Sequence, residues 1–222
     1  MFLDSVRFPK EEENYPFSCV RNAEELRVTS AVSLFCGGNG AGKTTLIELI
    51  AQKYGCPFIG EGREKFPKAL LNKIQISKTQ FPKQVFRFSA EEFIKYIEWV
   101  EAEKRYSRRM IEEIDAEYGD NRFAASLAKM PHCDTLYSLS GMYASDLINV
   151  SHGEGYMAFF DARLIPGGLY LMDEPEGALT YRNQYLLAVK IREAIKQDCQ
   201  FIIATHSPVL AAIPEADIYE AT

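Results

Sequence analysis

The residues with the clearest chemistry form a glycine-rich segment near the start of the chain. The spacing G-x-x-x-x-G-K-[ST] is matched by Gly37, Gly38, Asn39, Gly40, Ala41, Gly42, Lys43 and Thr44, with Thr45 directly after them. Glycines at these spacings let backbone N–H groups converge on an anion without Cβ clashes. Lys43 adds a positive charge for the β- and γ-phosphates, and the Thr44 hydroxyl suits Mg²⁺. The segment predicts a loop that binds a nucleoside triphosphate.

The elements on both sides of this segment are the ones that such a loop needs. The apolar run at residues 31–36 predicts a buried strand before it. Helical spacing of apolar residues from Lys43 to about Tyr54 predicts a helix after it. The N-terminus of a helix carries a partial positive charge, which favours a phosphate at that position. A chance glycine-rich turn would not require this strand and helix.

A pair of acids, Asp173 and Glu174, follows a second apolar run at residues 169–172. An acidic pair before a proline is by itself most often a solvated turn. Here the pair comes 130 residues after Lys43, and a strand tip beside a phosphate loop is where Mg²⁺ needs a carboxylate. We therefore expect Asp173 to bind the metal and Glu174 to orient or deprotonate the attacking water.

A histidine, His206, follows a third apolar run at residues 201–204. A lone histidine near a strand end is usually a satisfied polar residue. One helix and one strand separate His206 from Asp173, so a parallel sheet would bring both to the same carboxyl edge. There the imidazole is expected to hydrogen-bond the γ-phosphate.

The remaining pattern predicts an α/β chain that forms one domain over residues 1–222. Ser89 and Glu92 form a capping box at the head of a helix that reaches about Tyr118. A helical lobe is expected at about 89–150, inserted between the glycine-rich loop and the acidic pair Asp173–Glu174. Further expected elements are helices at 122–130, 139–149 and 181–197 and a strand at 85–88.

Together these motifs resemble those of P-loop ATPases of the ATP-binding-cassette (ABC) class. Within it the chain is most similar to small RecF/SMC-like ATPases of the "AAA family", or OLD-like, group. The distinctive match is Ser151-His152-Gly153-Glu154-Gly155, which stands 22 residues before Asp173, where cassette ATPases place their signature. Asp173–Glu174 then resembles the Walker B pair, residues 177–179 the D-loop, and His206 the switch histidine.

The resemblance implies an ABC-type head with a mixed or parallel sheet and a small helical subdomain. It implies ATP and Mg²⁺ as cofactors, with ATP hydrolysed to ADP and phosphate. It also implies a head-to-tail homodimer that forms on ATP binding, in which Ser151 and Gly153 of the second subunit close over the γ-phosphate. His152 and Glu154 depart from the transporter form of the signature, so turnover is expected to be slow without a partner.

Two further assignments rest on position alone. Tyr15 lies 28 residues before Lys43, where cassette ATPases stack an aromatic ring on adenine; Phe17 is the alternative. The glutamine that senses Mg²⁺ in this class corresponds to Gln84, with Glu91 as the alternative.

The overall composition limits the partners of the chain. Its 222 residues carry a net charge of −6, which disfavours non-specific binding of nucleic acid by the whole surface. Residues 61–87, however, contain seven Lys or Arg and two Glu, which makes them either a nucleic-acid contact or a solvated face. Five scattered cysteines without a C-x-x-C pair suit a reducing compartment. No apolar run is long enough for a membrane span, so we expect a cytoplasmic protein without direct membrane insertion.

Three functions are compatible with these motifs. The first is a soluble ATP-dependent dimeric switch in DNA maintenance or anti-phage defence. The second is the ATPase subunit of an ABC transporter, and the third is a nucleotide-gated adaptor that controls a separate effector protein. Residues 205–208, Thr-His-Ser-Pro, favour the first, because transporter cassettes more often have an acid directly after the histidine.

Overall fold

The computed structural model describes residues 1–8, 25–56, 66–119, 121–141 and 152–221. Tyr15, Phe17 and Ser151, three of the expected nucleotide contacts, lie outside these ranges. The chain divides into two compact units, which we call the sheet unit (Met1–Glu92 with Arg163–Thr222) and the helical unit (Phe93–Ala162).

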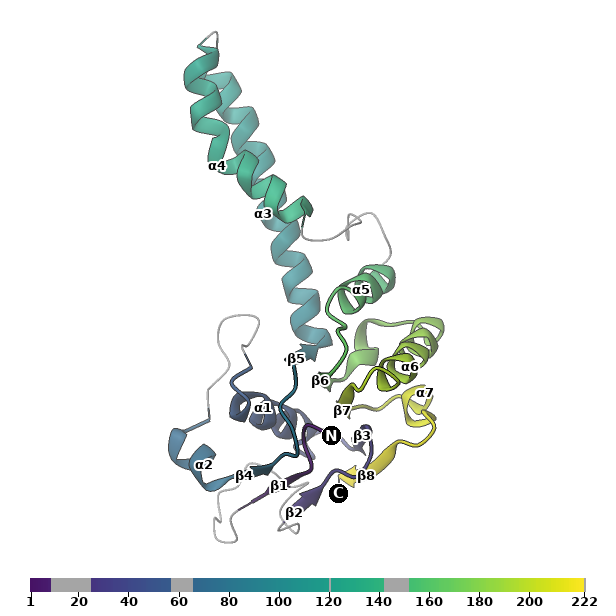
Figure 1. The fold of residues 1–222 in the computed structure, drawn as a ribbon. Coiled ribbons are helices and arrows are strands. Elements are labelled where there is room, and N and C mark those ends of the chain that lie inside the picture. Colours follow the sequence, from purple (N-terminus) through teal and green to yellow (C-terminus); the bar gives the residue numbers. More distant parts are fainter. Residues whose placement is uncertain (9–24, 57–65, 120, 142–151, 222) are drawn as a thin grey trace. The chain divides into compact units, whose positions relative to one another are not determined.

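The sheet unit contains a five-stranded sheet in which all neighbouring strands are parallel. Its order is β5-β6-β7-β3-β8 (Figure 1). The strands are β3 (Val32–Gly37), β5 (Gln84–Ser89), β6 (Gly168–Asp173), β7 (Gln200–Ala204) and β8 (Asp217–Ala221). Because β6, β7 and β3 are neighbours with one direction, their carboxyl ends meet at a single edge of the sheet.

The middle of this sheet is buried on both faces. Every residue of β6 and β7 is buried, as expected for parallel strands covered on two sides. Alternate side chains point to opposite faces. Leu171 and Ile202 belong to the cluster that contains the apolar residues of α1 (Lys43–Lys53), and the rings of Tyr170 and Phe201 stack at 5.0 Å.

Helix α1 packs on the central strands of the five-stranded sheet. It contacts β3, β6 and β7, and its buried residues are Lys43, Leu46, Ile47, Leu49, Ile50 and Ala51. Fully burying an aliphatic side chain contributes about 1.5–3 kcal/mol. This packing fixes the start of α1 at the carboxyl edge of the sheet.

A smaller antiparallel sheet completes the core of the same unit. Its order is β2-β1-β4, made of β1 (Ser5–Arg7), β2 (Glu25–Arg27) and β4 (Gln75–Ser77). Helix α2 (Lys68–Lys73) precedes β4, and the 3₁₀ helix η2 (Pro175–Ala178), α6 (Tyr181–Ile195) and α7 (Pro208–Ala211) belong to the C-terminal half.

The helical unit consists of two long helices and one short one. Helix α3 (Ala90–Tyr118) enters it from the sheet unit, and α4 (Arg122–Gly141) and α5 (His152–Asp161) follow. Helix α4 runs antiparallel to α3 (Figure 1), and an ion pair of 2.5 Å joins Lys129 to Asp115. At the start of α3, the ring of Phe93 packs edge-on against Tyr156 and Phe159 of α5.

The α/β class with a helix-flanked parallel sheet, expected from the sequence, is confirmed. The expected helix at 122–130 is part of the longer helix α4, which continues through Pro131 to Gly141. Most of the expected helix at 139–149 lies outside the described residues. Among the helices that the structure describes, none has both the length and the apolar character to cross a membrane.

Candidate nucleotide-binding site

The glycine-rich segment joins the end of β3 to the start of α1. Gly40 and Gly42 have φ angles of 80° and 87°, in the left-handed region that favours glycine. A Cβ atom added at Gly38 or Gly40 would meet nothing within 4 Å. The loop therefore leaves open space over its backbone, directly at the N-terminus of α1.

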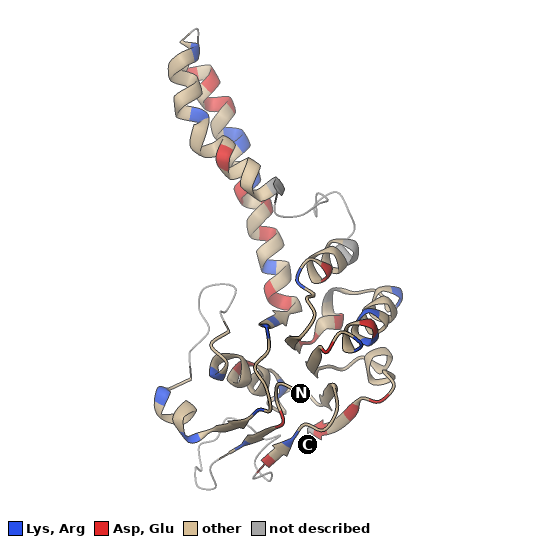
Figure 2. Cartoon of the chain, viewed as in Figure 1, with Lys and Arg blue, Asp and Glu red and all other residues tan. Residues whose placement is uncertain are grey.

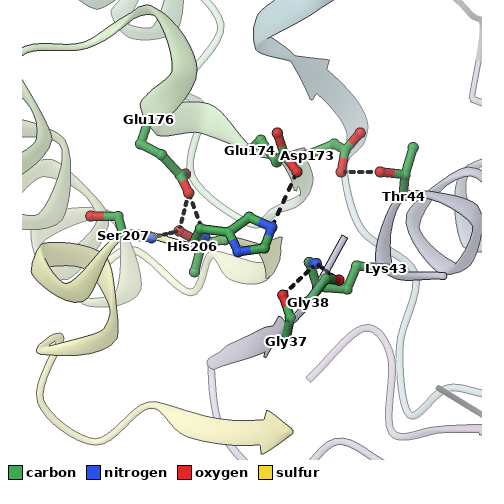
Figure 3. Close-up of polar contacts among 10 residues, drawn as sticks. Gly37, Gly38, Lys43, Thr44, Asp173, Glu174, Glu176, His206 and Ser207 are labelled. Carbon is green, nitrogen blue, oxygen red and sulfur yellow. Dashed lines mark hydrogen bonds and ion pairs between the residues drawn. The ribbon is translucent and has the colours of Figure 1, made fainter. Parts of the chain in front are cut away.

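Lys43, the first residue of α1, turns back over this loop. Its side-chain Nζ donates hydrogen bonds to the carbonyl oxygens of Gly37 (2.8 Å) and Gly38 (2.9 Å), although the residue is only 5% exposed (Figure 3). A buried ammonium group is costly unless polar atoms contact it. The two carbonyls hold the ammonium group beside the loop, where it could contact a bound anion.

Thr44 and Asp173 meet although 129 residues separate them in the sequence. The Thr44 hydroxyl donates to Asp173 Oδ1 at 3.0 Å (Figure 3). Thr44 belongs to the first turn of α1, and Asp173 is the last residue of β6 and is 6% exposed. The order β6-β7-β3 of the sheet and the packing of α1 on it produce this contact.

These groups fit a magnesium nucleotide by their chemistry. Hydroxyl and carboxylate oxygens are the hard ligands that Mg²⁺ prefers, with waters and phosphate oxygens in its remaining positions. The described residues contain no group of three His, Cys, Asp or Glu that would bind a metal by themselves. A metal at Thr44 and Asp173 would thus depend on a phosphate ligand, which Lys43 and the loop are placed to bind.

Glu174 and His206 approach each other at the same edge of the sheet. His206 Nε2 lies 3.4 Å from Glu174 Oε1. Glu174 has φ 44° and ψ 52°, a conformation that is uncommon for a residue other than glycine. Its N–H donates to the carbonyl of Ala204 at 2.9 Å, which holds this backbone next to the end of β7.

Glu176 is a residue of the site that sequence analysis does not identify. One of its carboxylate oxygens accepts hydrogen bonds from the Thr205 hydroxyl (2.8 Å) and from the His206 backbone N–H (2.5 Å). It therefore fixes the turn that presents His206. Acids in a turn after a strand are common, so nothing in the spacing distinguishes Glu176 from a solvated residue.

A second set of bonds holds the residue after the histidine. The Ser207 hydroxyl donates to Gln184 on α6 at 2.7 Å and accepts from the N–H groups of Val209 and Leu210, so it caps α7. Between Glu176 and Ser207, the backbone of His206 is fixed while its side chain remains 39% exposed.

Cys36 lies at the end of β3, just before the loop. Burial raises the pKa of its thiol above the usual value, and the negative charge of Glu176 adds to this effect. The thiol is therefore neutral at pH 7. It places no negative charge where a phosphate would bind.

Gln84 is not brought to this site. It is the first residue of β5, opposite Gly168, whereas Ser89 at the other end of β5 is opposite Asp173. Five residues of strand span about 16 Å. The Gln84 amide donates instead to the carbonyl of Arg163 at 3.2 Å. Glu91, the alternative, is exposed in the first turn of α3, on the Asp173 side of the strand.

The structure describes the other expected contacts in part. Gly153 is the second residue of α5.

In the basic segment at residues 61–87, Arg87 is buried and paired with Glu92 (2.9 Å) and Glu48 (3.5 Å), which removes it from the surface. Within the described part of this segment, residues 66–87, the exposed cations are Lys68, Lys73, Lys78 and Lys83. Figure 2 shows the Lys and Arg residues of the chain in blue.

Comparison with known proteins leaves the family open. No model of a protein family matches the sequence, and no curated protein matches it. The residues of this site are therefore what points to a function.

Proposed function

We propose that the chain is an ABC-type P-loop ATPase. It binds ATP and Mg²⁺ at residues 37–45, hydrolyses ATP, and acts as a dimeric switch. The observation that carries the proposal is the 3.0 Å contact between Thr44 and Asp173. It supports the assignment of the two motifs to one metal site, because a hydroxyl and a carboxylate that are 129 positions apart in the sequence lie within hydrogen-bonding distance.

Each residue has a distinct part in this proposal. Lys43 and the N–H groups of the loop bind the phosphates, and Thr44 and Asp173 hold the metal, which supplies electrostatic stabilisation of the phosphate charge. Glu174 orients and deprotonates the attacking water, and His206 contacts the γ-phosphate. Lys43 exchanges its two carbonyl acceptors for phosphate oxygens when the nucleotide binds.

The dimeric part of the proposal depends on the signature motif. Helix α5 begins at His152, so Gly153 lies in its first turn. A helix N-terminus with a glycine in its first turn presents N–H donors that suit a γ-phosphate bound to a second subunit. ATP would then join two subunits, and hydrolysis would release them.

Nucleic acid is the macromolecular partner that the surface supports. Between residues 66 and 87 the chain has lysines and no acid, in contrast to its overall charge of −6. Beside this segment is a groove of about 570 Å³ lined by residues that include Lys53, Tyr54, Lys78 and Phe81. Lys78 Nζ lies 3.9 Å from the centre of the Phe81 ring. Cations and aromatic rings together are typical of sites for single-stranded nucleic acid, which accords with a role in DNA maintenance or anti-phage defence.

Asp173→Asn tests the catalytic proposal. The substitution weakens the metal site, so phosphate release at saturating ATP and Mg²⁺ is expected to fall about 100-fold or more, since a metal contributes several kcal/mol to such reactions. Asp198→Asn is the matched control, because Asp198 is exposed, lies after α6 and has a φ of 60° that asparagine tolerates. Equal turnover by the two variants would contradict the assignment. ATP binding without turnover in the unsubstituted chain would favour the adaptor.

A further inference from the structure

Helix α4 carries its large apolar side chains on the face that points away from α3. The exposed fractions are 77% for Phe123, 54% for Leu127, 53% for Met130 and 82% for Tyr137. With Asp134, which is also exposed, their spacing is 4, 3, 4 and 3 residues. This is the a/d spacing of a coiled-coil seam. We call these five residues the outer stripe.

A second stripe with the same spacing faces α3. It consists of residues 125, 129, 132, 136 and 139. Ala125 and Leu139 are buried, Lys129 pairs with Asp115, and the His132 ring packs edge-on against Tyr106 at 5.9 Å. The face of α4 that contacts α3 thus consists of small and polar residues together with leucines. The larger apolar residues are those of the outer stripe, on the opposite face. A helix with α3 as its sole partner would have the opposite arrangement.

The residues that flank the outer stripe permit a close approach by another helix. They are Ala124, Ser126, Pro131, Cys133 and Ser138, all of them small or uncharged. Figure 2 shows most of α4 in tan, with few charges along it, in contrast to α3. Exposed helix surfaces are normally charged, so an uncharged band around an apolar stripe marks an interaction surface.

We propose that the outer stripe is a self-association surface, and that its partner is the same stripe of a second copy of this chain. A large aromatic side chain buries about 150–250 Å². Two aromatic and two aliphatic side chains of the outer stripe, half to four-fifths exposed, give roughly 500 Å² per copy, and two copies reach the roughly 1,000 Å² that a specific interface needs. The same stripe of a second copy also meets these apolar side chains with apolar side chains, so neither copy buries an unpaired polar group beneath them.

The charge of Asp134 selects the relative direction of the two helices. In a parallel pair each residue faces its own equivalent, so two Asp134 carboxylates would meet inside the seam. An antiparallel pair separates them, since each carboxylate then faces a different part of the partner helix. A single polar residue at such a position commonly fixes the register of a helix pair. This association does not require nucleotide and is independent of the proposed ATPase activity.

Sedimentation equilibrium of the full chain without nucleotide tests this proposal. Over roughly 1–200 µM the chain is expected to show a monomer–dimer equilibrium with a micromolar Kd. The double variant Leu127→Glu/Met130→Glu is expected to raise that Kd at least about 100-fold, since it places four charges in the seam of a dimer. Both positions are half-exposed, and circular dichroism checks that the helices are kept.

Two controls make the result specific. Leu186→Glu, at a 40% exposed leucine on α6, is expected to leave the Kd unchanged, and so is Lys43→Ala. If the glutamate pair prevents folding, Phe123→Ser/Tyr137→Ser replaces it, with the same expected direction. A monomer throughout the concentration range, a dimer that appears only with ATP, or equal Kd values for the stripe and α6 variants would each overturn the proposal. None of these results would contradict ATP binding at residues 37–45.

Discussion

Replacing Glu174 with glutamine is expected to stop ATP hydrolysis while ATP remains bound. Glutamine has nearly the same shape as glutamate, but it is a poor proton acceptor, and loss of a general base lowers rates by about 10²- to 10⁴-fold. Glu174 is half-exposed beside His206, and its backbone N–H is held by the carbonyl of Ala204, so the substitution leaves the backbone of this turn in place. Phosphate release in a single turnover measures the effect.

The same variant also reports on the dimeric state. If hydrolysis releases the subunits, Glu174→Gln in ATP and Mg²⁺ is expected to accumulate additional dimer on size-exclusion chromatography, beyond any that forms without nucleotide. Glu215→Gln is a matched control, because Glu215 is also an exposed glutamate with a positive φ, of 63°. Unchanged phosphate release by Glu174→Gln would remove Glu174 from the catalytic proposal.

Lys43→Ala is expected to lower the affinity for ATP by about 100-fold. A hydrogen bond to a charged group contributes about 1.5–3 kcal/mol, and each 1.4 kcal/mol corresponds to a factor of ten. Lys43 is the one residue of the site whose cation already lies over the loop, at 2.8 and 2.9 Å from its carbonyls. Titration with a fluorescent ATP analogue measures the change.

The control for this variant lies on the same helix. Lys53, the last residue of α1, donates from Nζ to the carbonyl of Leu71, so Lys53→Ala removes a lysine of the same helix that is away from the loop. It is expected to bind ATP as the unsubstituted chain does. Equal affinity of both variants for ATP would show that Lys43 is not a phosphate ligand.

The elements that carry the site could be predicted because their sequence signals are local and strong. The apolar runs before Gly37, Asp173 and His206 correspond to β3, β6 and β7, and the helical spacing after Lys43 corresponds to α1. The rule that parallel strands end at one edge then placed the motifs together. The contacts Thr44–Asp173 and Glu174–His206 agree with that placement.

The remaining elements depend on partners that are distant in the sequence. Strands β2 and β8 are short, and β2 has one apolar residue. Strand β2 is defined by its pairing with β1, and β8 by its pairing with β3. The hydrogen bond from the His206 backbone N–H to the Glu176 carboxylate likewise joins residues 30 positions apart. Gln84 corresponds to the Mg²⁺-sensing glutamine only through the family resemblance, and the register of β5 puts it at the opposite end of the strand from Asp173.

Helix α4 shows how a reliable local rule can be overridden. Proline usually ends a helix because it lacks an N–H and its ring clashes with the preceding turn. The helix nevertheless continues through Pro131, and contacts with α3 lie on both sides of it, at Lys129 and His132. Tertiary contacts along the helix offset the local cost.

The most direct test of the central claim is calorimetric titration of ATP into the unsubstituted chain, with Mg²⁺ and with EDTA. If Lys43, Thr44 and Asp173 form one site, ATP with Mg²⁺ binds once per chain with a Kd of about 1–100 µM, and binding weakens at least about tenfold in EDTA. The absence of saturable binding up to about 1 mM ATP with Mg²⁺ would contradict the account.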